Sequence, residues 1–235
     1  MAGRPSAFAH YRILIGKDLR REFRSKEMLS SMGIYALLVL IVYGAALAQT
    51  ERAFDILQMS GGLFWALVIF TSLLGLNRSF AAEKEQGSLE GILLVPMDRS
   101  VIFLAKASSN LLFLLIVEII TLPLFYFFFL TLTTPAPSSW LLIAPVFVGT
   151  LGIAGVGTLL ATITANTRGR DVMLAVLFIP LIFPLLYACA AATSAVLIGA
   201  GDFMQTFSVS LALAGGYDLI MILIGWALYD FVISA

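Results

Sequence analysis

Four long runs of this sequence contain no lysine, arginine, aspartate or glutamate and consist mainly of apolar residues. They are Met28–Thr50, Ile56–Asn77, Ile119–Thr167 and Val172–Gly201, with 23, 22, 49 and 30 residues. A helix needs roughly 20 apolar residues to cross the hydrocarbon core of a bilayer. The first two runs therefore fit one crossing each, the third fits two crossings with a loop, and the fourth fits one crossing with a tail.

The loop within the third run is predicted at "TTPAPSSW", residues 133–140, which holds two prolines, small polar residues and a tryptophan suited to the membrane interface. A last apolar segment, about residues 208–234, forms another span although it contains Asp218 and Asp230. The pattern thus predicts six membrane helices, near residues 29–48, 58–79, 106–131, 141–165, 172–191 and 209–233. A transmembrane barrel would show short alternating segments instead of continuous apolar runs. We predict an all-α membrane protein with one transmembrane domain over residues 29–235.

Composition and charge support this class and orient the bundle. Hydrophobic residues make up 60% of the chain and charged residues 12%, and the mean hydropathy is +1.01, which leaves too little polar surface for a water-soluble globule. Thirteen of the 14 lysines and arginines fall on one side of the predicted bundle. The positive-inside rule makes that side cytoplasmic, so both termini and the loops at residues 80–105 and 166–171 are predicted to face the cytoplasm. Basic residues beside membrane spans give no indication of nucleic-acid binding.

The first 28 residues are predicted to form a cytoplasmic amphipathic helix. Its apolar residues recur at helical spacing, at Phe8, Tyr11, Ile15, Leu19 and Phe23. The opposite side carries the cations Lys17, Arg20, Arg21 and Arg24. The favoured interpretation is a helix that lies in the cytoplasmic membrane interface with its cations near anionic headgroups, and the alternative is a solvated basic tail. The following apolar run is longer than the core of a signal peptide, so we expect it to be a retained span.

A mixed polar and apolar stretch, "FAAEKEQGSLEGILLVP" at residues 80–96, follows the second predicted span on the cytoplasmic side. Residues 78–86 can continue the second helix beyond the membrane, and Gly87 permits a break. Ser88 can then cap a short helix that ends at Pro96. One face of this helix would carry Leu89, Ile92 and Leu93. The pattern alone leaves two interpretations open, a docking surface for another protein or an interfacial turn resting on lipid headgroups.

The motif "EKEQGSLEGILLVP" resembles the coupling helix of ABC-2 type permeases. The wider run "LLGLNRSFAAEKEQGSLEGILLVPMDRSVIFLAK", residues 73–106, is similar to the CcmB family of cytochrome c maturation permeases, also called heme exporters. The glycine-rich fourth span "GTLGIAGVGTLLATITANTRGRD" and the proline-bearing fifth span "LFIPLIFPLL" agree with the same family. The resemblance extends over nearly the whole chain and implies a six-helix ABC-2 type bundle.

The resemblance implies a non-catalytic membrane subunit that is driven by a separate cytoplasmic ATPase. The chain has no G-x-x-x-x-G-K-[ST] phosphate loop, so ATP is expected on the partner subunit. The residues that would sit against this ATPase are Glu83, Glu85, Gly87, Ser88, Leu89, Glu90, Leu93 and Pro96. Six spans are half of a usual transporter, so a second copy or another membrane subunit should complete the assembly.

In this family the activity serves cytochrome c maturation, either as haem export or as ATP-driven release of a haem-loaded periplasmic chaperone. Other cytochrome c maturation membrane subunits and that chaperone are therefore expected as partners. Two alternatives remain, an ABC-2 permease for another lipid or drug, and a proton-coupled secondary transporter.

The candidate haem and metal ligands are few. The only histidine, His10, lies on the basic leader, and the only cysteine, Cys189, lies in an apolar stretch and is expected to pack. Met173 and Met221 lie in apolar helices and are also interpreted as packing residues. We therefore predict that this chain alone binds no haem, metal or other cofactor.

Two carboxyl groups, Glu118 and Asp218, lie within predicted spans that offer no lysine or arginine to pair with them. Such groups are costly in lipid and usually face the interior of a bundle. One interpretation is a protonated acid hydrogen-bonded to a partner such as Thr121 or Tyr126. The other is a proton relay or a contact with the helix of a partner protein.

The remaining patterns concern helix packing. Small residues at Gly149, Gly152, Gly155 and Gly157 predict the close approach of other helices to the fourth span. Pro180 and Pro184 predict a kink in the fifth span. The moderately apolar residues 190–208 are expected to form short re-entrant or periplasmic helices before the sixth span.

Overall fold

The structure is a computed structural model that describes residues 6–47, 53–85, 98–130, 138–164, 167, 169–199 and 201–234. Its helices are α1 (Ala7–Ser25), α2 (Glu27–Leu47), α3 (Ala53–Glu85), α5 (Arg99–Leu130), η1 (Ser139–Leu142), α6 (Ile143–Thr164), α7 (Arg170–Ile198) and α8 (Phe203–Ser234). The described part of the chain contains no strand, and six of its helices are long and apolar enough to cross a membrane. The prediction of an all-α membrane protein with six spans is confirmed.

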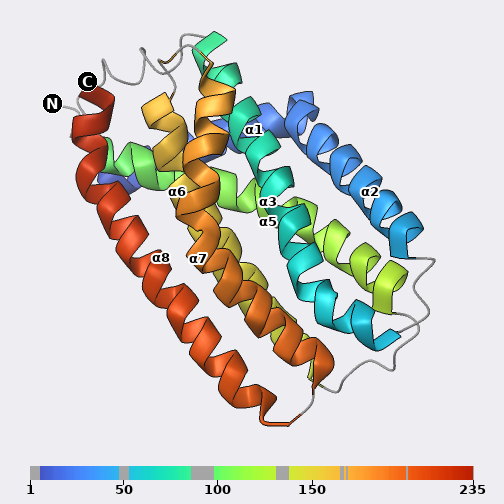
Figure 1. Ribbon diagram of the computed structural model, residues 1–235. Helices are drawn as coiled ribbons and strands as arrows, with labels where there is room; N and C mark the ends of the chain where they lie inside the picture. Colours follow the sequence, from blue (N-terminus) through green and yellow to red (C-terminus); the bar gives the residue numbers. More distant parts are fainter. Residues whose placement is uncertain are drawn as a thin grey trace, which may run out of the picture.

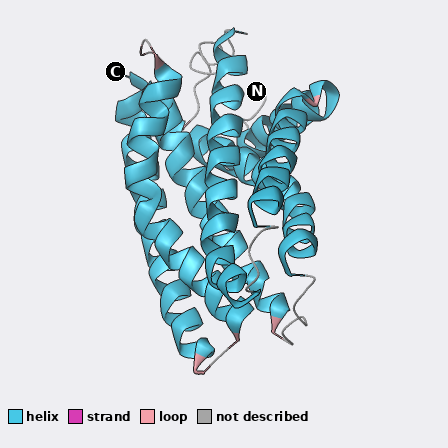
Figure 2. Ribbon diagram, turned by 45° about the vertical axis from the view of Figure 1, so that its right-hand side comes forward, coloured by secondary structure: helices cyan, strands magenta, loops and turns pink. Residues whose placement is uncertain are grey.

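The six long helices form one bundle, and α1 lies across one of its ends (Figures 1 and 2). The C-terminal end of α8 lies at this same end, which we call the α1 end. The side chain of Ser6 caps α1 by accepting a hydrogen bond from the amide of Ala9 at 3.3 Å. At the other terminus, Lys26 adopts a left-handed backbone with φ 56° and donates to the carbonyl of Glu22. This left-handed residue ends α1 directly before α2, so the chain turns from the end of the bundle into its first span.

Helix α6 lies at the centre of the bundle because its glycines let three other helices approach. In its most apolar window 78% of the residues are buried, against 22% in α2 and α8. A Cβ atom added at Gly149 would overlap the ring of Trp65 from α3, and one at Gly157 would overlap Leu76 from the same helix. One added at Gly152 would overlap Asp218 of α8 and Leu185 of α7. The predicted close approach at these glycines is confirmed.

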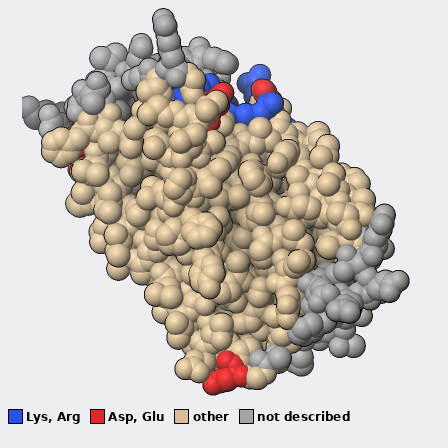
Figure 3. Space-filling view, in the orientation of Figure 1, with Lys and Arg blue, Asp and Glu red and all other residues tan. Residues whose placement is uncertain are grey.

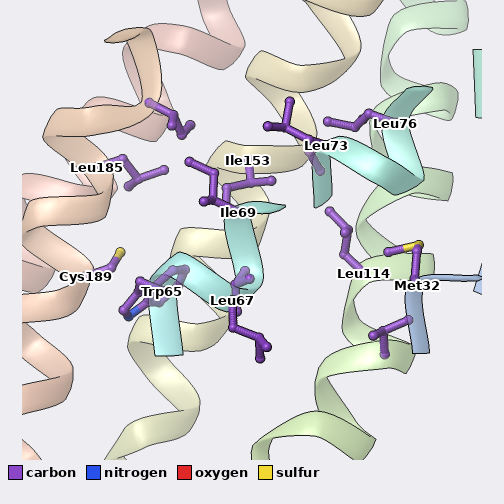
Figure 4. Close-up of a cluster of buried hydrophobic side chains, with 14 of the residues drawn as sticks. Met32, Trp65, Leu67, Ile69, Leu73, Leu76, Leu114, Ile153, Leu185 and Cys189 are labelled. Carbon is purple, nitrogen blue, oxygen red and sulfur yellow. The ribbon is translucent and has the colours of Figure 1, made fainter. Parts of the chain in front are cut away.

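The core around α6 joins side chains from most of the bundle. Figure 4 shows Trp65 and Leu76 of α3, Ile153 of α6 and Leu185 of α7 within this cluster. The indole Nε1 of Trp65 donates to the Thr193 hydroxyl of α7 at 3.0 Å, so this large ring is buried without an unbonded donor.

The expectation of short helices over residues 190–208 is wrong. Helix α7 continues without interruption to Ile198, and α8 begins already at Phe203. The added residues of α7 are rich in alanine, which has the strongest helix propensity. Gly199 ends the helix in a left-handed conformation with φ 60° and donates to the carbonyl of Ala195 at 3.0 Å. Pro180 and Pro184 both lie inside α7, which continues through them as one helix.

The outer surface of the bundle is apolar along its length. Large hydrophobic side chains are exposed on the outer spans, for example Leu38 of α2, Ile119 of α5, Phe183 of α7 and Phe231 of α8. On the face seen in Figure 3, the lysines and arginines gather at the α1 end, and the body of the bundle shows almost no charge. This surface suits hydrocarbon, as expected for a multi-pass membrane protein.

We predict that Gly149→Ala destabilises the protein. The new methyl group would overlap the ring of Trp65, and overpacking of this kind costs about 1 to 3 kcal/mol, more than the helix propensity gained from alanine. The matched control is Gly215→Ala in α8, where an added Cβ meets no atom within 4 Å. Thermal unfolding of the purified proteins in the same detergent should show a lower Tm for Gly149→Ala only. Equal Tm values for the two variants would contradict the assigned packing of α6.

Candidate functional site

The predicted coupling segment is located by the two helices that flank it. Helix α3 has 33 residues and is about 50 Å long at 1.5 Å per residue, whereas its membrane-spanning part ends near Ser79. It therefore continues past the span to Glu85, and the backbone of Glu83 and Glu85 belongs to this helical extension. The next described helix, α5, begins at Arg99, also at the α1 end.

The rest of the predicted coupling surface lies outside the described residues, namely Gly87, Ser88, Leu89, Glu90, Leu93 and Pro96. The expectation of a short helix there stays a prediction. The structure does describe the helices on both sides of residues 86–97. Both of these helices form ion pairs with other helices of the bundle.

Ion pairs at the α1 end join the two flanking helices to three other helices. Arg78 of α3 lies 2.9 Å from Glu27 of α2, and both side chains are exposed. Arg99 of α5 lies 3.2 Å from Asp230 of α8 and also donates to the Asp230 carbonyl at 3.3 Å. Exposed pairs such as these contribute about 0 to 1 kcal/mol each. Their main effect is to bring particular residues of α2 and α8 into contact with the flanking helices. Their contribution to the stability of the fold is small.

The third ion pair is different because it is buried. Nζ of Lys106 in α5 lies 2.9 Å from Oδ2 of Asp18 in α1, and each residue is only 2% exposed. Lys17 approaches the other oxygen of Asp18 at 3.4 Å. Nearby, the hydroxyl of Tyr11 donates to Ser108 of α5 at 2.9 Å. Helix α1 is therefore fastened to α5 by a charged pair and a hydrogen bond, two to three turns into the helix that follows the coupling segment.

Helix α1 is also bonded to the start of α2. Oε1 of Glu22 accepts a hydrogen bond from the amide of Leu29 at 2.9 Å, and this amide is one of the donors that the first turn of a helix leaves without a partner. Glu22 is 4% exposed, so it is buried along with Asp18. Both acids of α1 thus point into the protein and bond to different helices.

Residues Ala7–Ser25 form a helix, and its buried face differs from the predicted apolar stripe. Phe8 and Phe23 of the predicted apolar stripe are exposed, whereas Leu14, Asp18 and Glu22 are buried. The buried face is offset from the stripe because the two acids find a lysine and a backbone amide as partners. Whether the exposed phenylalanines contact lipid stays a prediction.

The sequence did not reveal the buried ion pair. Lys106 stands at the edge of the predicted third span, beside the charged loop at residues 80–105, and no partner was predicted for it. It lies inside α5, which starts at Arg99 instead of near residue 106. Two signals could have indicated this. Leu14, Asp18 and Glu22 recur at intervals of four on one helix face, and Lys106 directly follows the apolar residues 101–105.

The outward side of α1 forms an open basic groove. It is lined by Arg12, Lys17, Arg20, Arg21 and Arg24 together with Ile13, Gly16 and Ser25. This groove offers cationic donors suited to acidic side chains or phosphate groups. The groove lies at the α1 end of the bundle, where α3 ends and α5 begins.

The two intramembrane acids lie apart from this region, on either side of α6. Glu118 of α5 contacts the hydroxyl of Thr150 of α6, and Asp218 of α8 lies against Gly152 of α6. The suggested partner Thr121 was wrong, since its hydroxyl donates to the carbonyl of Val117 in its own helix. Among the described residues, no group of three or more His, Cys, Asp and Glu side chains is placed to hold a metal ion.

Comparison with known proteins places these features in a family. Residues 9–228 match the family described as CcmB protein. The chain is 27% identical to heme exporter protein B of Pseudomonas aeruginosa over 80% of this chain and 82% of that protein. It is 26% identical to heme exporter protein B of Rhodobacter capsulatus over 74% of this chain and 78% of that protein. With the Bradyrhizobium diazoefficiens protein of the same name the identity is 27%, over 67% and 69%.

We predict that Lys106→Met strongly destabilises the packing of α1. Methionine keeps the length of the side chain but leaves Asp18 buried without its closest cation, and breaking a buried pair in this way costs about 3 to 5 kcal/mol. Thermal unfolding should show a lower Tm, and limited proteolysis should cut α1 faster. A second change, Asp18→Leu in the same chain, should recover most of the loss.

The matched control for this prediction is Glu27→Gln, which breaks the exposed pair with Arg78 and should cost at most about 1 kcal/mol. If Lys106→Met and Glu27→Gln lowered the stability by the same amount, the buried pair would not be what holds α1 in place.

Proposed function

This chain belongs to the CcmB protein family, and from that membership we propose that it is the permease subunit of an ABC transporter for cytochrome c maturation. The observation that supports this most strongly is the extent of the family match. It covers residues 9–228 and so includes nearly all of α1, the first five spans, the whole coupling segment and most of the sixth span. The relatives are named heme exporter protein B, so haem is the proposed substrate class of the assembled transporter.

In the proposed mechanism a separate cytoplasmic ATPase docks on the coupling segment, residues 80–96. Closure of its nucleotide-binding subunits would push this segment and thereby move the ends of α3 and α5. The ion pairs of Arg78, Arg99 and Lys106 would pass the movement to α2, α8 and α1 in turn. A force applied to this short segment would then move the connected helices of the bundle together as rigid bodies.

The proposed function implies an orientation in the membrane and an assembly. The α1 end would face the cytoplasm of a bacterial inner membrane, in agreement with the positive-inside rule. The basic groove of α1 would lie beside the docked ATPase. A second copy of the chain or another membrane subunit would complete the transporter.

We further propose that the chain binds no haem by itself. Haem iron in proteins is held by groups such as histidine, and the only histidine, His10, lies on α1 at the cytoplasmic end. The chain's part in haem handling would then be mechanical. Of the two family activities, release of a haem-loaded periplasmic chaperone fits this better than carriage of haem through the bundle.

We predict that Leu89→Asp and Glu90→Lys abolish co-purification of the ATPase with the full-length chain from native membranes. The first change puts a charge on the apolar docking face, and the second reverses a charge beside it. The matched control is Asp202→Lys, a charge reversal at an exposed residue of the α7–α8 connection, which should leave the amount of captured ATPase unchanged. Survival of the association in both segment variants would show that the coupling surface is assigned wrongly.

We predict that the purified chain, mixed with excess haem and then passed through a desalting column, retains no stoichiometric haem. The measurement is the absorption spectrum, in which axial histidine ligation gives a distinct Soret band. His10→Ala should leave the spectrum unchanged. A stoichiometric, histidine-type spectrum that disappears in His10→Ala would contradict the proposal and make this chain a haem carrier.

A further inference from the structure

Two carboxyl groups flank α6 at neighbouring positions in the middle of the bundle. Glu118 of α5 meets Thr150, and Asp218 of α8 meets Gly152, two residues further along α6. The two acids are 5% and 3% exposed, and both lie within membrane-spanning segments. Within the described part of the chain, neither acid forms an ion pair with a lysine or arginine. Each carboxyl group is therefore buried at a place where a negative charge has no counter-charge.

The contacts of Thr150 allow the hydrogens at Glu118 to be counted. The hydroxyl oxygen of Thr150 lies 2.8 and 2.7 Å from the two carboxyl oxygens of Glu118 and 2.7 Å from the carbonyl oxygen of Val146. A hydroxyl group has a single hydrogen to donate. If Glu118 were ionised, three oxygens without hydrogens would crowd around that one donor.

Protonation of Glu118 removes this conflict. The carboxyl O–H can then donate to the oxygen of Thr150, and the hydrogen of Thr150 can go to the carbonyl of Val146. Each short contact is then a hydrogen bond or the immediate neighbour of one. The other side chains lining the small pocket beside Glu118, from α2, α3 and α5, include no ionisable group. The geometry thus favours one bound proton at Glu118.

The surroundings of Asp218 also favour a protonated carboxyl group, for a different reason. Both of its carboxyl oxygens are buried and have no hydrogen-bond partner among the described residues. Asp218 packs so closely against Gly152 that an added Cβ at Gly152 would overlap Oδ1, and the same Cβ would overlap the side chain of Leu185. The contact leaves no room for a hydration shell or a bound metal ion on that side. A proton is the one ligand small enough to neutralise the acid in this packing.

The ionisable groups near Asp218 provide no positive charge. They are the thiol of Cys189 on α7 and the phenol of Tyr217 on α8 itself, whose hydroxyl donates to the carbonyl of Leu181 at 2.6 Å. An isolated carboxylate is far more costly to bury than a neutral carboxylic acid. The described surroundings of Asp218 therefore favour the neutral acid.

We propose that Glu118 and Asp218 are two intramembrane proton-binding sites, both occupied when α6 is packed between α5 and α8 as in this structure. Each site is shared between two helices, so its proton is bound only while those helices stay together. Separation of α6 from α5 or α8 would let water reach the acid, which ionises at neutral pH once it is hydrated. Proton release and the opening of the bundle are then linked, and a rise in pH favours the open form.

The test is infrared spectroscopy of the full-length chain in lipid nanodiscs at neutral pH, without the ATPase. A carboxylic acid shows a C=O stretch at higher frequency than the two stretches of a carboxylate. Glu118→Gln and Asp218→Asn should each remove one acid band from the spectrum and leave the carboxylate bands unchanged. The matched control is Glu27→Gln, which removes an exposed, ion-paired carboxylate and should reduce a carboxylate band instead. Loss of carboxylate intensity in Glu118→Gln and Asp218→Asn would overturn the proposal.

A second measurement avoids mutation, in case a variant does not fold. The unaltered chain is labelled with carbon-13 at the side-chain carboxyl groups of either glutamate or aspartate. Each label should shift an acid band at neutral pH. If neither label shifts an acid band, both sites are ionised and the proposal is wrong.

The link to bundle opening rests on the proposed transport function and has its own readout. In a complex with the ATPase, a nucleotide-trapped state should convert acid bands into carboxylate bands. Acid bands that are present in the isolated chain but never change in the complex would overturn the link and leave the two proton sites standing.

Discussion

Hydrocarbon cannot solvate a charge or an unbonded peptide group, and this constraint accounts for most of the structure. Each unsatisfied polar group costs several kcal/mol in the bilayer interior, so the spans are continuous helices that bond their own backbone. The same constraint acts on side chains. Lys106 and Asp18 pair with each other, Glu22 bonds a backbone amide, and Glu118 contacts a hydroxyl. Asp218 has no such partner among the described residues, which is why a bound proton is the natural way to neutralise it.

The number of spans could be predicted because it depends only on the apolar segments along the chain. A segment of about 20 apolar residues has few alternatives to a helix in a membrane, and each of the six predicted spans is a helix in the structure. The packing role of Gly149, Gly152 and Gly157 could be predicted for a similar reason, since small residues in a span permit close approach whatever the partner is. The identity of the partner could not be predicted. Trp65, Asp218 and Leu76 are far from these glycines in the sequence.

The predictions that failed depended on contacts between distant residues. No partner for Lys106 could be predicted, because it lies at the edge of the predicted third span and only the fold shows that Asp18 of α1 neutralises it. The extension of α7 to Ile198 was missed because the moderate hydrophobicity of residues 190–208 was taken as a sign of separate short helices, although the alanines there favour continuation of the helix. The assignment of the coupling segment rests on its motif and stays a prediction, whereas the structure shows that the helices on both sides of it are bonded to other helices.

The two proposals concern two parts of one mechanism, a cytoplasmic segment that would receive the movement of an ATPase and a central helix whose packing would hold two protons. The central claim is that an ATPase docks on residues 80–96, and site-specific photo-crosslinking in native membranes tests this most directly. A photoreactive residue at Leu89 should form an adduct with a cytoplasmic ATPase subunit, and the same residue at Asp202, at the other end of the bundle, should not. Adducts with lipid alone from position 89, or an ATPase adduct from position 202, would contradict the claim.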